Sequence, residues 1–404
     1  MVMDDFLKRT IRVGLLLCLG LIACSCREEP VEPSLIEDFP RIEISAAEPY
    51  GRLTKLDKHC TVTIVDKANV LLQSEGKIQL RGNSTARAPK RPFLLQLDAE
   101  ASILDMPAAK DWILLANYYD KTMLRNALAF RLAEDSRLNW TPHARFVELW
   151  YNNEHKGTYQ LCEKIQPHPH RLNIPQDGWL VEIDTRTPEN EPQFRTQHIE
   201  QPIHVLYPKN ADFTGKTDAV AQFFAEAENA LFGPSFADST GGWRDYLDEN
   251  AFIDWYLINE IAKSVDATFF SSCYMYGGQD GKIVIGPIWD FDLAFGNTTY
   301  SETDNPQGWH IRYATWYLRL FEDPHFVQAV KTQFDDFYQH REDYYQFIRS
   351  QAEILRPHVQ ANDNHWHTMS KQIWHEQPLY TYDDNIAYLL SWLSLRLEWM
   401  KNNW

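Results

Sequence analysis

The segment GPIWDFDLAFG, residues 286–296, places two carboxylates two positions apart among large apolar and aromatic side chains. In an extended strand, Asp290 and Asp292 would point to the same side, because side chains alternate along a strand. The segment has no basic residue, and a carboxylate in apolar surroundings is costly unless a positive charge meets it. A hard cation such as Mg2+ takes oxygen ligands from one or two carboxylates and from phosphates. The segment therefore indicates a metal site; the alternative is a pair of turn or helix-capping aspartates beside a core strand.

The residues before this segment predict a helix, a loop and a β-hairpin. Apolar side chains recur at helical spacing through residues 254–264, with Asp254 in the first turn. Residues 273–286 read as two short strands joined by a glycine-rich turn. Asp266 therefore falls in the loop between helix and hairpin. Because a hairpin folds back on itself, it can bring Asp266 close to Asp290, and the order of a catalytic-loop aspartate, a hairpin and a metal-binding aspartate is that of a protein kinase.

With these residues in view, the chain resembles the spore-coat protein H (CotH) kinase-like family. Each block of the resemblance is weak alone, but the ordered set, from about residue 76 to the C-terminus, is specific. The resemblance implies an atypical kinase-like fold, the use of ATP with a divalent metal, and phosphoryl transfer to protein in some members. The blocks are LRGNST (80–85), PKRPF (89–93), WILLANYYDKTMLRN (112–126), FVELW (146–150), GTYQLCEKI (157–165), VD (265–266) and WDFD (289–292).

The resemblance also assigns residues. Asp266 falls on the family's catalytic aspartate and Asp290 on its metal-binding one, and the spacing adds Asp292 to the predicted metal ligands. The chain departs from the family pattern at one point. Many members carry Asn a few residues after the catalytic aspartate, where a second metal ligand would lie, and here Ser272 takes that place. A hydroxyl is a poorer metal ligand than an amide carbonyl, so a second metal site, and catalysis with it, stays open.

Basic residues gather around the loop 83–92, although the chain as a whole is acidic. Arg81, Lys90 and Arg91 belong to this cluster. A glycine-containing loop with several cations between two strands would suit phosphate binding; the alternative is a solvated basic loop. Arg125 lies in the first turns of a helix predicted over 120–133, where a cation opposes the helix dipole. It is therefore either tied to a carboxylate or available to a phosphate.

Glu163 ends the second strand of a hairpin predicted over 145–163, on the same face as Tyr159 and Leu161. If that face is buried, Glu163 needs a cation, and the candidates are Lys90, Arg125 and Lys164. A lysine–glutamate pair would order an ATP-binding lysine, as in protein kinases. The alternative is a purely structural ion pair.

The complete pattern predicts an α+β chain with an atypical protein-kinase-like fold over residues 41–404. A β-rich N-terminal lobe would span about 41–185, and a helical C-terminal lobe with the catalytic segment about 216–404; the polar residues between them would form an insertion. Apolar stripes at helical spacing near 326–337 and 386–400 support the helical part. Cys162 and Cys273 fall in predicted strands, where they would act as small buried apolar residues.

The N-terminus has the pattern of a bacterial lipoprotein signal peptide over residues 1–23. Three basic residues precede an apolar run from 13 to 23 that is short for a membrane helix, the alternative interpretation. The run ends Leu-Ile-Ala-Cys, which predicts lipidation at Cys24, and the acidic, proline-containing residues 24–40 would form a tether. We therefore expect an exported protein anchored through lipid to the bacterial cell envelope, with the outer membrane favoured and the periplasmic or surface side open.

Two functions remain after these observations. The first is an exported kinase, dependent on ATP and Mg2+ or another divalent cation, that phosphorylates a hydroxyl group of an unknown protein. The second is a catalytically inactive kinase-like protein that serves as a binding or structural lipoprotein, since exported compartments usually lack ATP. The net charge of −17 argues against a nucleic acid polymer as partner, but it does not exclude a local basic pocket for phosphate.

Overall fold

The computed structural model describes residues 39–208, 213–278 and 280–404. The predicted signal peptide, Cys24 and almost all of the predicted tether lie outside these residues. Residues 39–404 belong to one unit, which contains both helices and strands, as the sequence predicts. No helix among the described residues has the length and apolar character needed to cross a membrane.

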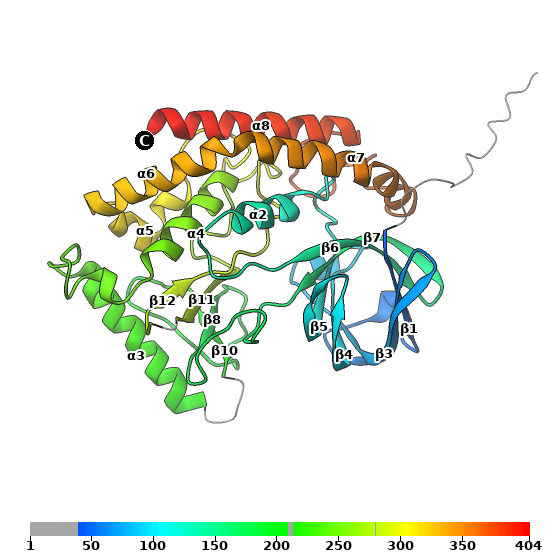
Figure 1. The fold of residues 1–404 in the computed structure, drawn as a ribbon, viewed down its shortest axis with the longest axis horizontal. Coiled ribbons are helices and arrows are strands. Elements are labelled where there is room, and N and C mark those ends of the chain that lie inside the picture. Colours follow the sequence, from blue (N-terminus) through cyan, green and yellow to red (C-terminus); the bar gives the residue numbers. More distant parts are fainter. Residues whose placement is uncertain (1–38, 209–212, 279) are drawn as a thin grey trace, which may run out of the picture. The chain divides into compact units, whose positions relative to one another are not determined.

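Seven strands close into a barrel (Figure 1). They follow the order β1-β2-β3-β4-β5-β7-β6, and the barrel closes where β1 pairs in parallel with β6. Alternate side chains fill the interior of the barrel, which is why β1 and β2 alternate between buried and more exposed residues, whereas most of β7 is buried on both faces. The strands are β1 (Arg41–Ala46), β2 (Lys58–Asp66), β3 (Asn69–Leu80), β4 (Phe93–Ile103), β5 (Met106–Leu115), β6 (Ala144–Tyr151) and β7 (Glu154–Glu163).

A second sheet of five strands lies outside the barrel, in the order β12-β11-β8-β10-β9. The hairpin predicted over 273–286 is confirmed as β11 and β12. The residues predicted as an insertion, 186–215, contain β9 and β10, which extend this sheet, and Ile203 and Val205 of β10 are buried. The β-rich region therefore divides at about residue 163 between two sheets. The strands are β8 (Leu180–Ile183), β9 (Gln193–Phe194), β10 (Ile203–Tyr207), β11 (Cys273–Gly277) and β12 (Ile283–Ile285).

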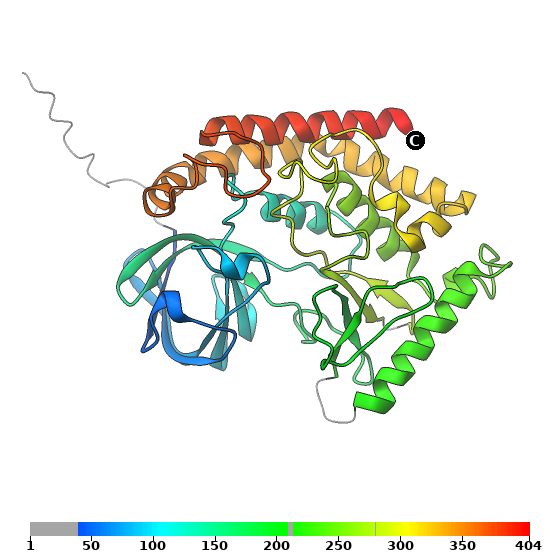
Figure 2. The same ribbon diagram turned by 180° about the vertical axis from the view of Figure 1, so that it is seen from behind.

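Helices make up most of the C-terminal half, and α7 and α8 run side by side (Figures 1 and 2). The two predicted apolar stripes lie on α6 and α8 and are largely buried. The helices are α2 (Arg125–Glu134), α3 (Phe213–Phe232), α4 (Glu249–Ala262), α5 (Thr315–Leu320), α6 (Pro324–Gln339), α7 (Arg341–Trp366) and α8 (Tyr382–Asn403). Short 3-10 turns are η1 (Tyr50–Arg52), η2 (Thr85–Arg87), η3 (Trp243–Asp245) and η4 (Ile311–Tyr313).

Two helices begin at different residues from those predicted. Helix α2 starts at Arg125 rather than Asp120, because the Asp120 carboxylate accepts the backbone N–H of Arg125 at 2.9 Å. Helix α4 starts at Glu249, where the Asp248 side chain caps it. Asp254 therefore lies in the middle of α4, buried and paired with Arg137, and not in the first turn. Helix α4 ends at Ala262, close to the predicted end.

A buried ion pair joins α4 to α8. The Glu260 carboxylate lies 2.6 Å from the Arg396 guanidinium, and both side chains are fully buried. The same carboxylate accepts the backbone N–H of His310 (2.8 Å) and of Arg312 (2.9 Å). The pair therefore holds the segment before α5 against the end of α4, next to the loop that carries Asp266. Cys60, Cys162 and Cys273 are free and buried, as expected for the last two.

Candidate functional site

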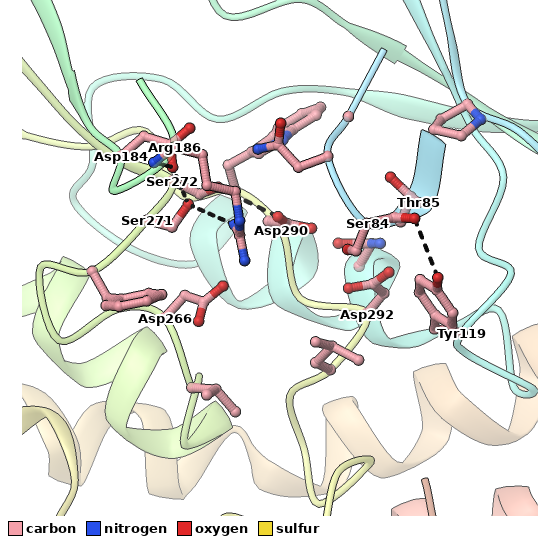
Figure 3. Close-up of a pocket in the computed structure, with 18 of the residues that line it drawn as sticks. Ser84, Thr85, Tyr119, Asp184, Arg186, Asp266, Ser271, Ser272, Asp290 and Asp292 are labelled. Atoms are coloured by element: carbon pink, nitrogen blue, oxygen red, sulfur yellow. Dashed lines mark hydrogen bonds between the residues drawn. The ribbon is translucent and has the colours of Figure 1, made fainter. Parts of the chain in front are cut away.

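A cavity of about 690 Å³ brings together segments that are far apart in the sequence. Its walls come from the loop after β3, the end of β5, the end of β8, the loop between α4 and β11, and the segment after β12. Asp266, Asp290 and Asp292 all line it. Figure 3 shows Asp290 between Asp266 on one side and Asp292 on the other. The predicted convergence of Asp266 and Asp290 on one pocket is therefore found.

The two aspartates after β12 converge in a different way from the one predicted. Strand β12 ends at Ile285, and Asp290 has a positive φ of 72°. A positive φ is uncommon for a residue other than glycine and breaks the alternation of a strand. Asp290 is open to the cavity, whereas Asp292 is buried beside it. The loop conformation, and not strand alternation, brings both carboxylates to the cavity.

Three aspartates of the cavity, Asp266, Asp290 and Asp292, are destabilised in their charged form. Burial, and then the nearby Asp290 carboxylate, raise the pKa of Asp266 to about 6, although Arg186 opposes the shift. Asp290 is accessible from the cavity, but the surrounding protein removes much of its hydration and raises its pKa, while Arg81 and a hydrogen bond from Ser272 oppose the shift. The pKa of Asp292 is raised strongly by burial and by Asp290. A bound cation would relieve this repulsion, so the cavity fits a divalent metal electrostatically.

The geometry limits how a metal would bind. Within the described ranges, no group of three or more His, Cys, Asp and Glu side chains is arranged to hold an ion. An ion at Asp290 and Asp292 would need further oxygen ligands from water or bound phosphates. Mg2+ commonly binds in this way, through one or two carboxylates plus substrate phosphates. The donor set therefore fits Mg2+ with a phosphate-bearing ligand better than a metal held by protein alone.

Ser272 contacts the predicted metal ligand directly. Its Oγ donates to Oδ2 of Asp290 at 3.3 Å, and its own φ is positive, at 57°. The residue predicted to replace a metal-binding Asn therefore lies beside Asp290, in the same cavity. It supports the Asp290 carboxylate through a hydrogen bond.

Sequence reasoning missed a charged cluster at the end of β8. Oγ of Ser271 donates to Oδ1 of Asp184 at 2.8 Å, and Nη1 of Arg186 donates to the same Ser271 Oγ at 3.3 Å (Figure 3). Burial raises the pKa of the neighbouring Glu182 to about 7. The alternating charges Glu-x-Asp-x-Arg after a short apolar run were a signal. Their position in the cavity, however, depends on the pairing of β8 with β11, where Glu182 lies opposite Tyr274.

Of the predicted basic residues, Arg81 lines the cavity. Its guanidinium lies 5.1 Å from the Trp289 ring centroid. From the predicted loop 83–92, residues 83 to 85 also line the cavity, and Lys55 and Arg186 add positive charge. Two guanidinium groups therefore face the carboxylates in a protein of net charge −17.

Three other predicted cations, all in the described part of the chain, lie away from this cavity. Lys90 is 1% exposed, donates to the backbone carbonyl of Thr158, and lies 4.6 Å from the Tyr159 ring centroid. Arg91 donates to the Leu53 carbonyl at 3.3 Å. Arg125 is buried and paired with Asp120, with its Nε bonded to the Ala294 carbonyl at 3.0 Å. For Arg125, the salt-bridge alternative is the one observed.

Glu163 is fully buried, as its position beside Tyr159 and Leu161 predicts, but it lies outside the cavity lining. Its carboxylate accepts from His143, with Nδ1 at 2.8 Å, and lies 3.5 Å from Nε of Arg171. Neither partner was among the candidates: Arg171 reaches Glu163 from the loop that follows β7, and His143 comes from the segment just before β6. The observed partners are those of a structural ion pair.

The burial of Lys90 predicts a pH dependence of stability. Burial lowers the pKa of Lys90 from 10.5 to about 7, and the Glu148 carboxylate opposes the shift. Between these values the unfolded chain binds more protons than the folded chain, so stability should rise as the pH increases from 7 to 10. The contribution of Lys90 is at most about 1.4 kcal/mol per pH unit. Urea unfolding at several pH values measures it, and Lys90→Met should flatten the rise; an equally steep rise in the variant would contradict the assignment.

Comparison with known proteins covers all of the cavity lining except Lys55. A family model described as CotH kinase protein matches residues 78–400. The match includes Arg81, the end of β8, the loop with Asp266 and the segment with Asp290 and Asp292. No match was found among curated proteins.

Proposed function

The chain belongs to the CotH kinase protein family, and from this premise we propose that it is an ATP-dependent kinase that phosphorylates a protein hydroxyl. One observation carries the proposal. Asp266, Asp290 and Asp292 meet two guanidinium groups in a single cavity, although they come from distant segments. Carboxylates for a metal and an acceptor, with cations for phosphate oxygens, are the parts that phosphoryl transfer requires.

Each side chain has a role in this proposal. Asp290 and Asp292 would hold Mg2+, which would neutralise charge on the nucleotide phosphates. Arg81 and Arg186 would pair with phosphate oxygens. Asp266 would orient the acceptor hydroxyl and accept its proton as the acceptor oxygen bonds to the γ-phosphorus and ADP leaves. A pKa of about 6 leaves Asp266 mostly ionised at neutral pH while keeping it a better base than an exposed aspartate.

The test begins with the wild-type protein. We expect isothermal titration to show ATP binding in the presence of Mg2+ and a large loss of affinity in EDTA. Transfer is then measured with γ-labelled ATP and a mixture of cell-envelope proteins. Failure to bind ATP at any Mg2+ concentration would reject the kinase proposal.

The second candidate is a nucleotide-binding or structural protein without transferase activity. Ser272 favours it, because the family resemblance predicts a metal-binding Asn at this position, whereas the serine hydroxyl donates a hydrogen bond to Asp290. Mg2+-dependent binding of ATP without transfer to any protein, in the wild type and in Ser272→Asn alike, would support it. If Ser272→Asn instead gains transfer activity, the absence of a metal-binding Asn at this position explains the inactivity of the wild type.

We further propose that lipid at Cys24 anchors the chain in the cell envelope. The basic start, the short apolar run and the Leu-Ile-Ala-Cys ending support this placement. The several acyl chains of a bacterial lipoprotein anchor stably, whereas one chain binds reversibly. Cys24→Ser should therefore lose label from a palmitate analogue and leave either a soluble protein or an unprocessed precursor. Cys26→Ser is the matched control; label retained in Cys24→Ser and lost in Cys26→Ser would show that the other cysteine is modified.

A further inference from the structure

A second pocket, of about 450 Å³, lies on the outside of the barrel. Its lining comes from β1, β2, β3 and the hairpin between β6 and β7. Ile42 and Ile44 of β1 belong to the barrel core, so Arg41 and Glu43, which alternate with them, face outward into this pocket. Among the described residues, none lines both this pocket and the cavity of the aspartates. None of the roles proposed above uses it.

Four side chains of this pocket form a row across four strands. Glu43 of β1 is in register with Trp150 of β6 on one side and with Thr63 of β2 on the other. Thr63 is in turn opposite Gln73 of β3. Side chains at paired positions of neighbouring strands lie next to each other on one face of the sheet. At about 4.8 Å between strands, the row from Trp150 to Gln73 spans about 14 Å, which suits an elongated ligand.

Trp150 is the aromatic end of this row, and its ring is held in place. The indole is partly exposed and packs against the His155 ring, with 5.4 Å between the centroids and 46° between the planes. Nε2 of His155 lies 2.5 Å from the Glu148 carboxylate, which also accepts from Thr158 and His358. A satisfied polar network of this kind is rigid. The ring is therefore positioned before a ligand arrives, which lowers the entropy cost of binding.

The polar side chains of the row are available to a ligand. In the described part of the chain, the indole N–H of Trp150, the Thr63 hydroxyl and the Gln73 amide have no hydrogen-bond partner. Arg41 and Glu43 pair with each other at 3.3 Å, with side chains that are 43% and 44% exposed. The pocket therefore offers both donors and acceptors at nearly balanced charge. This balance does not favour a phosphate or a polyanion, which requires an excess of cations.

Recognition at this face must come from side chains. The seven described strands close completely, so the barrel presents no free edge to which a peptide strand could add. An aromatic ring beside several donors and acceptors matches the two sides of a sugar. The negative face of the ring attracts the C–H groups of a pyranose, and each sugar hydroxyl both donates and accepts a hydrogen bond.

We propose that this outer face of the barrel binds a neutral oligosaccharide. Trp150 stacks on one sugar ring, and Thr63 and Gln73 bind hydroxyl groups farther along the chain. The length of the row requires more than one sugar unit. This binding does not depend on the proposed kinase activity. It accords with the proposed lipid anchor, because polysaccharides are abundant at bacterial cell surfaces.

The test is isothermal titration of the full chain with neutral tetrasaccharides of glucose, mannose and N-acetylglucosamine. We expect the wild type to bind at least one of them. Trp150→Ala should weaken that binding about tenfold or more, as expected for a central aromatic contact, and Trp150→Phe should keep most of it. Gln73→Ala should weaken it severalfold. Tyr313→Ala is the matched control, because Tyr313 is an aromatic residue that is 63% exposed and lies outside the pocket lining.

Gln73→Ala also guards against an effect on folding. Its side chain is exposed on the barrel surface, so the variant should fold like the wild type, and a loss in both Gln73→Ala and Trp150→Ala assigns binding to the row. Titration with Mg-ATP is the second readout, and Trp150→Ala should leave any ATP affinity unchanged, because Trp150 is outside the cavity of the aspartates.

Four results would overturn the proposal. If no neutral tetrasaccharide binds the wild type, the site does not bind sugars, whether or not ATP binds. If a tetrasaccharide binds the wild type, Trp150→Ala and Gln73→Ala equally well, it binds elsewhere. If a tetrasaccharide of galacturonic acid binds more tightly than every neutral one, the site selects anions. If an uncharged peptide rich in serine and glycine binds and the sugars do not, the face docks a protein.

Discussion

Asp266→Ala is expected to lower the rate of phosphoryl transfer about 10²- to 10⁴-fold while leaving Mg2+-dependent ATP binding intact. The range is the usual contribution of a general base. Asp266 acts on the acceptor during transfer, so its loss should appear in kcat and hardly in the dissociation constant of ATP. The variant removes one of several mutually repelling carboxylates, so the remaining charges of the cavity gain stability and the fold should persist.

The measurement pairs titration of ATP with the transfer of labelled phosphate to an envelope protein. Asp266→Asn is the useful second variant, because it keeps the size and hydrogen bonding of the side chain but not its basicity. Transfer that proceeds at the wild-type rate in both variants would show that Asp266 is not the base. Loss of ATP binding in Asp266→Asn would place Asp266 among the groups that hold the donor.

Asp290→Ala is expected to abolish the Mg2+ dependence of ATP binding. The carboxylate lies open to the cavity beside Asp292, and the ion would bind through these two groups and the phosphates. Without Asp290, the affinity for ATP in Mg2+ should fall to that measured in EDTA. Because phosphate charge would then face the Asp292 carboxylate without a cation, the fall should be large.

Exposed Asp98, on the barrel strand β4, provides the control, since Asp98→Ala removes one negative charge outside the cavity lining. It should bind Mg-ATP like the wild type. Undiminished, Mg2+-dependent binding by Asp290→Ala would refute the metal role and leave Asp292 as the remaining candidate. Equal losses in both variants would indicate a general charge effect.

Much of the local structure follows from short-range patterns. The hairpin of β11 and β12 follows from a glycine-rich turn between two apolar runs, and the hairpin of β6 and β7 turns at Asn152 and Asn153, both with positive φ. The helices α6 and α8 follow from apolar side chains at helical spacing. These elements depend on neighbours within a few residues, so composition and spacing suffice to predict them.

The roles of single charged residues could not be read in the same way. Lys90, Arg125 and Glu163 look alike in the sequence: each is a charge near an apolar run. Each is buried, and each has a hydrogen-bond partner from the tertiary structure, namely the Thr158 carbonyl, Asp120 and His143. A buried charge must find a partner, but the sequence does not say whether that partner is protein or ligand.

The sequence by itself determined the α+β class, the family, and the three aspartates that meet in the cavity, because their order along a helix, a loop and a hairpin is local. Tertiary structure alone decided the rest of the site. The pairing of β8 with β11 brings Asp184 and Arg186 to Asp266, and the Lys121–Glu376 ion pair brings Trp374 to Tyr119 across about 250 residues of chain. Contacts of that range depend on the closure of sheets and the packing of helices, which no local pattern encodes.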